Sequence, residues 1–137
     1  MKNVPISQVM KKSPVCVEMD TRLEEVRRLL EEHGFHHLPV LDGDELVGII
    51  SDRDILRLVS PFLDTAGEME RDLEVLNKAA HQVMTRQPIC VSLDDSLNTV
   101  IDWMTKVSIS CIPVLDNGQL VGIITWRDLV SLLTFED

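Results

Sequence analysis

The sequence lacks an excess of positive charge. It contains 13 lysines and arginines against 23 aspartates and glutamates, which gives a formal net charge of −10 and a pI of about 4.7. Affinity for nucleic acid depends on clustered basic residues that neutralise phosphates. We therefore expect no binding to DNA or RNA, although a few local cations could still hold a single phosphate group.

Long hydrophobic runs are also missing. The longest apolar runs, such as Leu46–Ile50, fall far short of the roughly 20 residues that a membrane-spanning helix needs. Met1–Gln8 has no apolar segment of the kind found in secretory signals. The three cysteines are an odd number, and Cys16 and Cys90 lie in apolar surroundings. They are expected to be reduced, buried core residues, so we expect a cytoplasmic protein without membrane contact.

Motifs of catalysis are absent from the sequence. It has no glycine-rich phosphate loop, no nucleophile elbow, and no cysteine–histidine pair in a known catalytic arrangement. The carboxylates lie mainly on predicted helix faces among other charges, as on solvated surfaces. We therefore expect a protein that is not an enzyme and requires no cofactor.

An internal repeat is the strongest positive signal. When the sequence is shifted by 74 positions, Gln8–Leu58 aligns without a gap with Gln82–Leu132, and 21 of the 51 aligned residues are identical. Two copies of this length indicate a pseudo-symmetric pair of half-domains with a shared core, and with ligand sites in twos between the copies. The predicted boundaries are 1–60 for the first repeat, 61–82 for a helical linker and 83–137 for the second repeat.

Each copy is predicted to contain a strand, a helix, two strands and a second helix. The strands around the first helix should be parallel and the hairpin antiparallel, so the fold class is α+β with mixed sheets. Asp20 or Thr21 is expected to cap the first helix, and Gly34 to end it. The predicted elements are Val15–Val17, Arg22–His33, His37–Leu41, Glu45–Ser51 and Asp52–Val59, followed by Ile89–Val91, Ser96–Lys106, Cys111–Leu115, Gln119–Thr125 and Trp126–Leu133.

The linker between the copies has a helical pattern. Thr65 and Glu68 have the spacing of a capping box, and apolar residues follow at steps of three and four as far as Val83. We predict an amphipathic helix over Asp64–Val83. It either covers the sheet edges or forms a dimer contact.

Three motifs that recur in both copies carry a family resemblance. They are a Pro-Val-Leu-Asp strand, a Leu-Val-Gly-Ile-Ile strand and a following Ser/Thr-x-Arg-Asp sequence. With the order of the elements, they resemble a tandem pair of CBS (cystathionine-β-synthase) domains, a Bateman module. The resemblance implies two repeats packed through their sheets, and a non-catalytic regulatory module that binds AMP, ADP, ATP or S-adenosylmethionine in clefts between them. It also implies a homodimer that signals to an effector protein. The alternative is a structural dimerisation module without a ligand.

The Ser/Thr-x-Arg-Asp motifs supply the main candidate site residues. Ser51 with Asp54, and Thr125 with Asp128, have the spacing of a capping box, which is a purely structural interpretation. The same geometry would offer helix-end amides to a phosphate and a carboxylate to a ribose diol. The resemblance implies contacts with phosphate or ribose, and the candidate set also includes the arginines of both motifs, Arg53 and Arg127.

Two histidines precede the hairpin in the first copy only. The resemblance places His36 and His37 near ligand phosphates, whereas the second copy has Ser110 and Cys111. We therefore expect phosphorylated ligands to bind the two sites unequally and with a dependence on pH. Alternatives are exposed polar residues without a role, or a metal site with His33.

The segments before the first strands complete the candidate set. The resemblance implies that backbone around Ser13 and Val15, and around Gln87 and Ile89, holds the adenine. The apolar side chains at two of these positions would equally suit an ordinary core. Trp126, beside the second site, could cover the sheet edge, stack on a nucleoside or block the site.

The first helix of each copy has more apolar surface than one core face needs. Leu29 lies beside the inward stripe of the first helix, and Trp103 takes the same place in its counterpart. We therefore expect a two-fold homodimer packed through these helices, with Trp103 near its centre. The alternative is that Trp103 packs under the linker helix.

Overall fold

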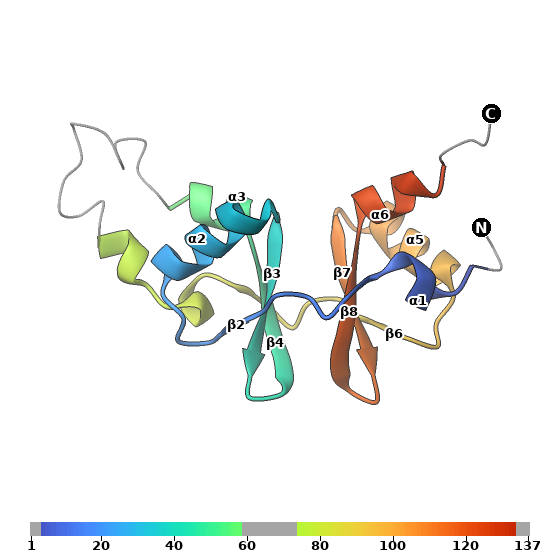
Figure 1. Ribbon diagram of the computed structural model, residues 1–137, viewed down its shortest axis with the longest axis horizontal. Helices are drawn as coiled ribbons and strands as arrows, with labels where there is room; N and C mark the ends of the chain where they lie inside the picture. Colours follow the sequence, from blue (N-terminus) through green and yellow to red (C-terminus); the bar gives the residue numbers. More distant parts are fainter. Residues whose placement is uncertain (1–3, 59–73, 134–137) are drawn as a thin grey trace. The chain divides into compact units, whose positions relative to one another are not determined.

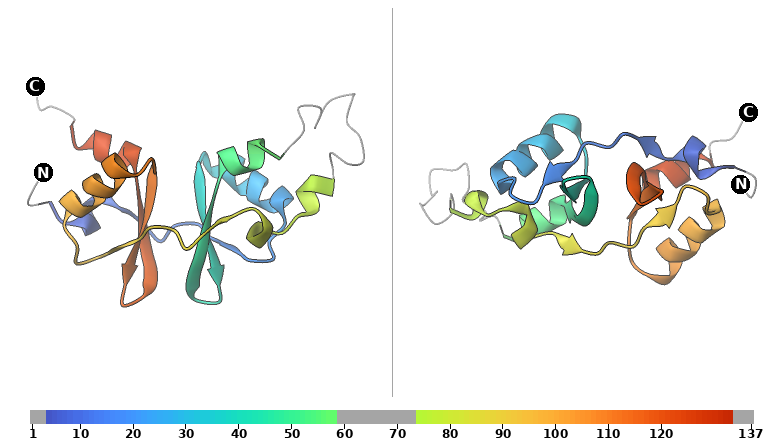
Figure 2. Two further views of the ribbon diagram at one scale, coloured as in Figure 1. Left: turned by 180° about the vertical axis from the view of Figure 1, so that it is seen from behind. Right: turned by 90° about the horizontal axis from the view of Figure 1, so that it is seen from below.

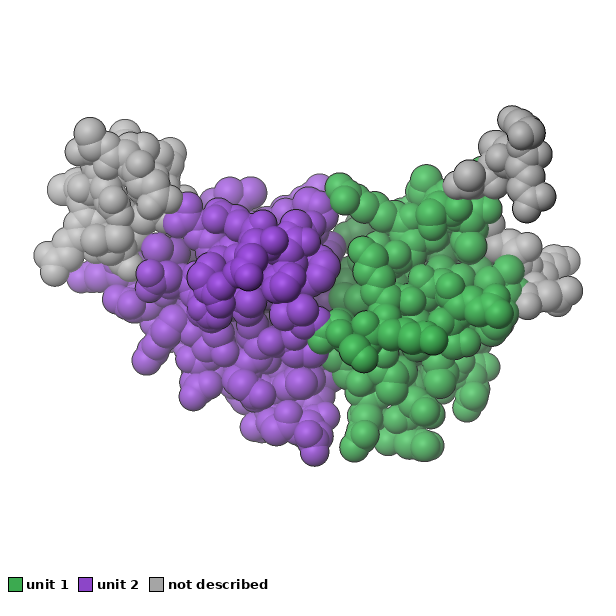
Figure 3. Space-filling model, in the orientation of Figure 1, with its two compact units in different colours: residues 1–14, 88–137 green, residues 15–87 purple. Residues whose placement is uncertain are grey.

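The computed structural model describes residues 4–58 and 74–133, which form parts of two compact units. Unit 1 consists of residues 1–14 and 88–137, and unit 2 of residues 15–87 (Figure 3). The units therefore do not divide the chain in the order of its repeats. The first 14 residues of the first repeat belong to the same unit as the second repeat.

Unit 2 contains a four-stranded sheet with two helices on one face (Figures 1 and 2). Its strand order is β2-β3-β4-β5, with β2 parallel to β3 and the other pairs antiparallel. The elements are β2 (Val17–Glu18), α2 (Leu23–His33), β3 (His37–Asp42), β4 (Glu45–Ser51), α3 (Asp52–Leu56), the 3₁₀ turns η1 (Val75–Asn77) and η2 (Ala80–Gln82), and β5 (Thr85–Arg86).

Unit 1 repeats this arrangement with the strand order β1-β8-β7-β6. Here β6 is parallel to β7, and the other two pairs are antiparallel. The predicted order of elements and the mixed sheets are confirmed in both units. The elements are α1 (Ile6–Val9), β1 (Lys11–Lys12), β6 (Val91–Ser92), α5 (Leu97–Lys106), β7 (Cys111–Asp116), β8 (Gln119–Thr125) and α6 (Trp126–Ser131).

Helix α2 ends at His33 as its pattern predicts but begins one residue later than predicted, at Leu23. Its buried side chains recur at the spacing of one helix face, and Gly34 ends it in the left-handed conformation at φ 67°. The predicted side-chain cap is wrong, because Arg22 occupies the cap position without such a bond. The hydroxyl of Thr21 instead accepts from the Glu18 amide at 3.0 Å, and the Leu23 amide donates to the carbonyl of Lys78.

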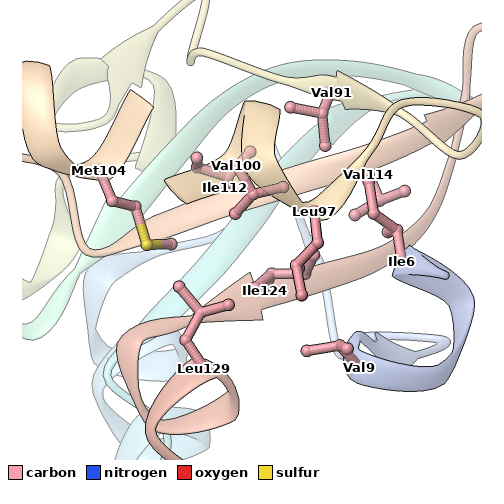
Figure 4. Packing of buried hydrophobic residues seen from close by; sticks show 10 residues of the cluster. All are labelled: Ile6, Val9, Val91, Leu97, Val100, Met104, Ile112, Val114, Ile124 and Leu129. Atoms are coloured by element: carbon pink, nitrogen blue, oxygen red, sulfur yellow. The ribbon is translucent and has the colours of Figure 1, made fainter. Parts of the chain in front are cut away.

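Each unit has its own hydrophobic core between the helices and one face of the sheet. In unit 1, α5, α6 and the sheet strands supply most of the buried side chains, and Ile6 and Val9 of α1 pack with them (Figure 4). Ile6 is 1% exposed. Full burial of an aliphatic side chain contributes roughly 1.5–3 kcal/mol, so the N-terminal segment is an integral part of this core.

The outermost strands β1 and β5 cross from one repeat to the sheet of the other. Strand β1 pairs with β8, where the carbonyl of Lys11 would lie 3.0 Å from a Cβ at Gly122 and the side chain of Met10 would clash with it. Strand β5 pairs with β4 in the same way, with the carbonyl of Thr85 at 2.9 Å and Met84 over Gly48. Met10 over Gly122 and Met84 over Gly48 are thus equivalent contacts in the two units.

The predicted helix over Asp64–Val83 is wrong from Val75 onward, whereas Glu74 is still helical. Residues 59–73, which include the predicted capping box, lie outside the described residues. From Val75 to Val83 the chain forms η1 and η2, separated by extended backbone at Lys78 and Ala79. The extended backbone lets Ala79 pair with Arg22 and lets the Ala80 amide donate to Thr21 at 2.8 Å, so tertiary pairing replaces the helix.

Several element ends differ slightly from the prediction. The first strands begin later, at Val17 and Val91, and α3 and α6 end at Leu56 and Ser131. Within the described segments, none of the helices has both the length and the apolar character required to cross a membrane.

Candidate functional site

Ser51 and Asp54 close the junction between β4 and α3. The Ser51 amide donates to Oδ2 of Asp54 at 2.8 Å, and the Asp54 amide donates to Oγ of Ser51 at 3.2 Å. At the equivalent junction of unit 1, the Thr125 amide donates to Oδ2 of Asp128 at 2.8 Å, and the Thr125 hydroxyl lies 3.1 Å from the same oxygen. The spacing of these residues thus produces the predicted capping contacts in both units.

Backbone hydrogen bonds at the helix starts contradict the expectation that these amides are free to bind a phosphate. The Asp52 amide donates to the carbonyl of His36 at 2.9 Å, and the Trp126 amide donates to that of Ser110 at 3.1 Å. Because the Asp54 amide is also bonded within the cap, amides that the sequence suggested for a phosphate already have partners. The free amides expected at the start of α3 are therefore largely absent from its described first turn.

The carboxylates keep one oxygen outside the caps. Oδ2 of Asp54 and Oδ2 of Asp128 accept the capping bonds. For neither residue does the described part of the chain supply a hydrogen bond to Oδ1. Both side chains are half-buried. Each cap thus fixes the position of a carboxylate whose second oxygen can accept hydrogen bonds from a ligand.

The histidines of unit 2 lie near the carboxylates of Asp52 and Asp54. His37 is directly opposite Ser51 in the β3–β4 ladder, so their side chains extend on the same face of the sheet. Burial lowers the pKa of His37, although the nearby carboxylates of Asp52 and Asp54 act in the opposite direction. His36 Nδ1 lies 2.8 Å from Oδ2 of Asp52. Sequence analysis missed Asp52, whose only signal was its place directly after the predicted hairpin.

Unit 1 has different chemistry at the equivalent positions. Cys111 lies directly opposite Thr125 and is 8% exposed. Burial raises the pKa of its thiol, and the negative charge of Asp128 adds to the effect. Trp126 replaces Asp52 and is 46% exposed. A thiol and an indole thus stand where unit 2 has an imidazole and a carboxylate.

The adenine-holding candidates lie where the chain passes from one unit to the other. Ser13 and Gln87 both adopt the left-handed conformation at φ 49°, which is uncommon for residues other than glycine. Their amides lie 3.3 Å from the carbonyls of Val121 and Val47, respectively. The only sequence signal near this conformation is the proline that follows each residue.

The structure assigns the candidate residues to both units. Val15 and Ile89 are half-buried, and Arg53 and Arg127 are exposed. Unit 2 contains Val15, His36, His37, Ser51, Arg53, Asp54 and Gln87, and unit 1 contains Ser13, Ile89, Thr125, Arg127 and Asp128.

The described residues do not form the metal site that the sequence offered as an alternative. Across residues 4–58 and 74–133, no three His, Cys, Asp or Glu side chains are arranged to hold a metal ion. His33 stacks on Phe35, with ring centroids 5.1 Å apart. The thiols of Cys16 and Cys90 are half-buried, and burial raises the pKa of Cys16 to about 11, which keeps its thiol protonated at neutral pH.

Comparison with known proteins identifies relatives over nearly the whole chain. The family model of the CBS domain matches twice, at residues 6–61 and 80–134. A CBS domain-containing protein of Dictyostelium discoideum is 34% identical over 133 residues, covering 95% of this chain and 91% of its own. An uncharacterized protein of Methanocaldococcus jannaschii is 35% identical over 152 residues, with coverages of 93% and 90%.

A solved structure agrees in fold and contains ligands. The CBS domain pair of protein MJ0100, in complex with 5′-methylthioadenosine and S-adenosyl-L-methionine, superposes with a TM-score of 0.77. It is 28% identical, and the alignment covers 95% of each chain.

Proposed function

The chain belongs to the CBS-domain family as a tandem pair of repeats, and from this premise we propose that it is a non-catalytic regulatory module for adenosine-containing ligands. It would bind such a ligand in each unit and pass the signal to an effector protein. The observation that carries the proposal is the capped aspartate of each unit, Asp54 and Asp128. Each is held by backbone contacts and has an oxygen left to accept hydrogen bonds.

A ribose diol suits this arrangement. It presents two neighbouring hydroxyl donors, and a fixed carboxylate accepts such donors in charge-assisted hydrogen bonds. The ligands of the MJ0100 pair, 5′-methylthioadenosine and S-adenosyl-L-methionine, both contain adenosine. We therefore propose an adenosine-containing ligand, with AMP, ADP, ATP and S-adenosylmethionine as the candidates. The residues around each aspartate, His36, His37 and Arg53 in unit 2 and Arg127 in unit 1, would surround its 5′ substituent.

Thermal unfolding with increasing adenosine or AMP distinguishes this proposal from a dimerisation module without ligand. A ligand that binds only the native state raises the unfolding temperature progressively with its concentration. Saturable stabilisation supports the regulatory module. Its absence for every candidate ligand would leave the dimerisation module as the better account.

Loss of either aspartate should weaken ligand binding. We expect Asp54→Ala and Asp128→Ala each to lower the affinity of their own site for adenosine by about 1–3 kcal/mol, the scale of lost charge-assisted hydrogen bonds. Calorimetric titration measures this effect. Both changes also break a cap, so Asp95→Ala is the control, because Oδ2 of Asp95 accepts from the Ser92 amide at 2.7 Å in a similar local contact. Wild-type affinity in both aspartate variants would refute the ribose role.

We also propose a two-fold homodimer through the first helices of the repeats. Trp103 is 39% exposed on α5 and Val107, one turn later, is also exposed, whereas Leu29 on α2 is half-buried. Large apolar side chains on a helix surface are typical anchors of subunit contacts.

Sedimentation should show a dimer for the wild type and a monomer for Trp103→Glu at micromolar concentration. Thr105→Glu is the matched control, since it adds the same charge to an exposed position of the same helix. A folded wild-type monomer excludes the dimer, and a dimeric Trp103→Glu excludes Trp103 from the interface.

A further inference from the structure

The two candidate sites differ in local charge. Beside Asp54, unit 2 has Asp52, Arg53 and two histidines, so the site has a charge of −1 when both imidazoles are neutral. Beside Asp128, unit 1 has Arg127, and its charges cancel. Protonation of both imidazoles would change unit 2 to +1. Which of the two sites has the higher affinity for an anion therefore depends on the protonation of the histidines.

Contacts in unit 2 place the two imidazoles among charged groups. His36 Nδ1 lies 2.8 Å from Oδ2 of Asp52, and His37 lies opposite Ser51, the cap of Asp54. The carboxylates of Asp52 and Asp54 favour the proton on His37, whereas burial, His36 and Arg53 disfavour it. Burial is the largest effect, so the pKa of His37 lies below its ordinary value of 6.5 and its ring is neutral at pH 7.5.

Unit 1 has no titrating group of this kind at the equivalent positions. Ser110 and Cys111 replace the histidines, and Trp126 replaces Asp52. The thiol of Cys111 is buried with a raised pKa and stays neutral in the same pH range. The change of charge that depends on histidine is therefore confined to unit 2.

We propose that the two sites accept adenosine ligands of different charge, with unit 1 taking the anionic ligand at pH 7.5–8 and unit 2 taking it only when His36 and His37 are protonated. At neutral pH, unit 2 selects an uncharged or cationic adenosine ligand. The inference rests on the proposed function. It also restricts an earlier expectation: the repeat that contains the histidines should be the better phosphate site only below neutral pH.

The effect does not require contact between the ligand and one particular imidazole. Charges interact with little screening within the Debye length of about 8 Å at physiological ionic strength, so the whole cluster would act on the 5′ substituent of a ligand whose ribose is bound to Asp54. Complete protonation of both imidazoles, a change of two charges at a partly exposed site, should alter the affinity for a single negative charge by about tenfold, and protonation of one imidazole by less.

Adenosine and adenosine 5′-sulfate are suitable probes, since they share base and diol and differ by one negative charge that is fixed over this range. Asp128→Ala isolates the site of unit 2, and Asp54→Ala isolates that of unit 1. Calorimetry at pH 8.0 and 5.5 gives the ratio of the two affinities for each variant. From pH 8.0 to 5.5, we expect this ratio to shift several-fold towards the sulfate in unit 2, because burial limits the protonation of His37, and less than twofold in unit 1.

Substitution of the histidines provides the matched control. In the Asp128→Ala background, His36→Gln with His37→Gln should remove the pH dependence of the ratio while adenosine still binds. A ratio in unit 2 that stays constant with pH, or one that still shifts without the histidines, overturns the inference alone. If adenosine binds neither site of the wild-type protein, the proposed function fails and this inference fails with it.

Discussion

Ile6→Ala should lower the free energy of unfolding by about 2–5 kcal/mol, the usual cost of truncating a fully buried aliphatic side chain. Ile6 is 1% exposed and packs in the core of unit 1, although it belongs to the first repeat, most of which lies in unit 2. The loss combines the transfer free energy of three carbon atoms with the cavity that they leave. Urea denaturation followed by circular dichroism measures it.

Leu56→Ala is the control for this experiment. Leu56 is 71% exposed, so its truncation should change the stability by less than about 0.5 kcal/mol. If Ile6→Ala is equally mild, the N-terminal segment does not belong to the core of unit 1.

Gly48→Ala and Gly122→Ala should each destabilise the protein by about 1–3 kcal/mol, as overpacking does in a tight core. At a strand position with room for a methyl group, replacing glycine by alanine should instead raise the stability, because alanine restricts the unfolded chain more than glycine does. Here a Cβ at Gly48 would lie 2.9 Å from the carbonyl of Thr85 and would displace the side chain of Met84. Calorimetric unfolding of each variant measures the sign and size of the effect.

A double-mutant cycle separates the two contacts of the added methyl group. If the flexible Met84 side chain is the main obstacle, Met84→Ala should recover much of the loss caused by Gly48→Ala. If the carbonyl of β5 is the obstacle, the two effects should add. An unchanged or raised stability in both glycine variants would contradict the close packing of the crossing strands.

The long hairpins could be predicted from the sequence with high accuracy. Glu45–Ser51 and Gln119–Thr125 match β4 and β8 to the residue, because apolar runs are bounded there by turn residues and by helix starts. Local signals of this kind suffice for elements of six or seven residues. Strands β1 and β5 have two residues each and arise only from pairing with a distant strand, so no local pattern indicates them.

The candidate site could be predicted in part. The Ser/Thr-x-Arg-Asp spacing correctly brings Ser51 to Asp54 and Thr125 to Asp128, since three residues span the first turn of a helix. The pairing of His36 with Asp52 was not foreseen, because it depends on the register of the hairpin. The same register determines which carbonyls accept from the amides at the helix starts, so the sequence alone could not predict that those amides are bonded.

The crossing of β1 and β5 means that neither repeat contains a complete sheet. A polypeptide that ends after the first repeat would have three strands of one sheet, together with a helix and a strand that complete the other. The two halves of a gene divided between these repeats would therefore encode complementary fragments and not two independent domains. Each fragment would therefore fold only together with the other, as in an obligate heterodimer. The first fragment would supply β1 to the sheet of the second, and the second would supply β5, which precedes Pro88, to the sheet of the first.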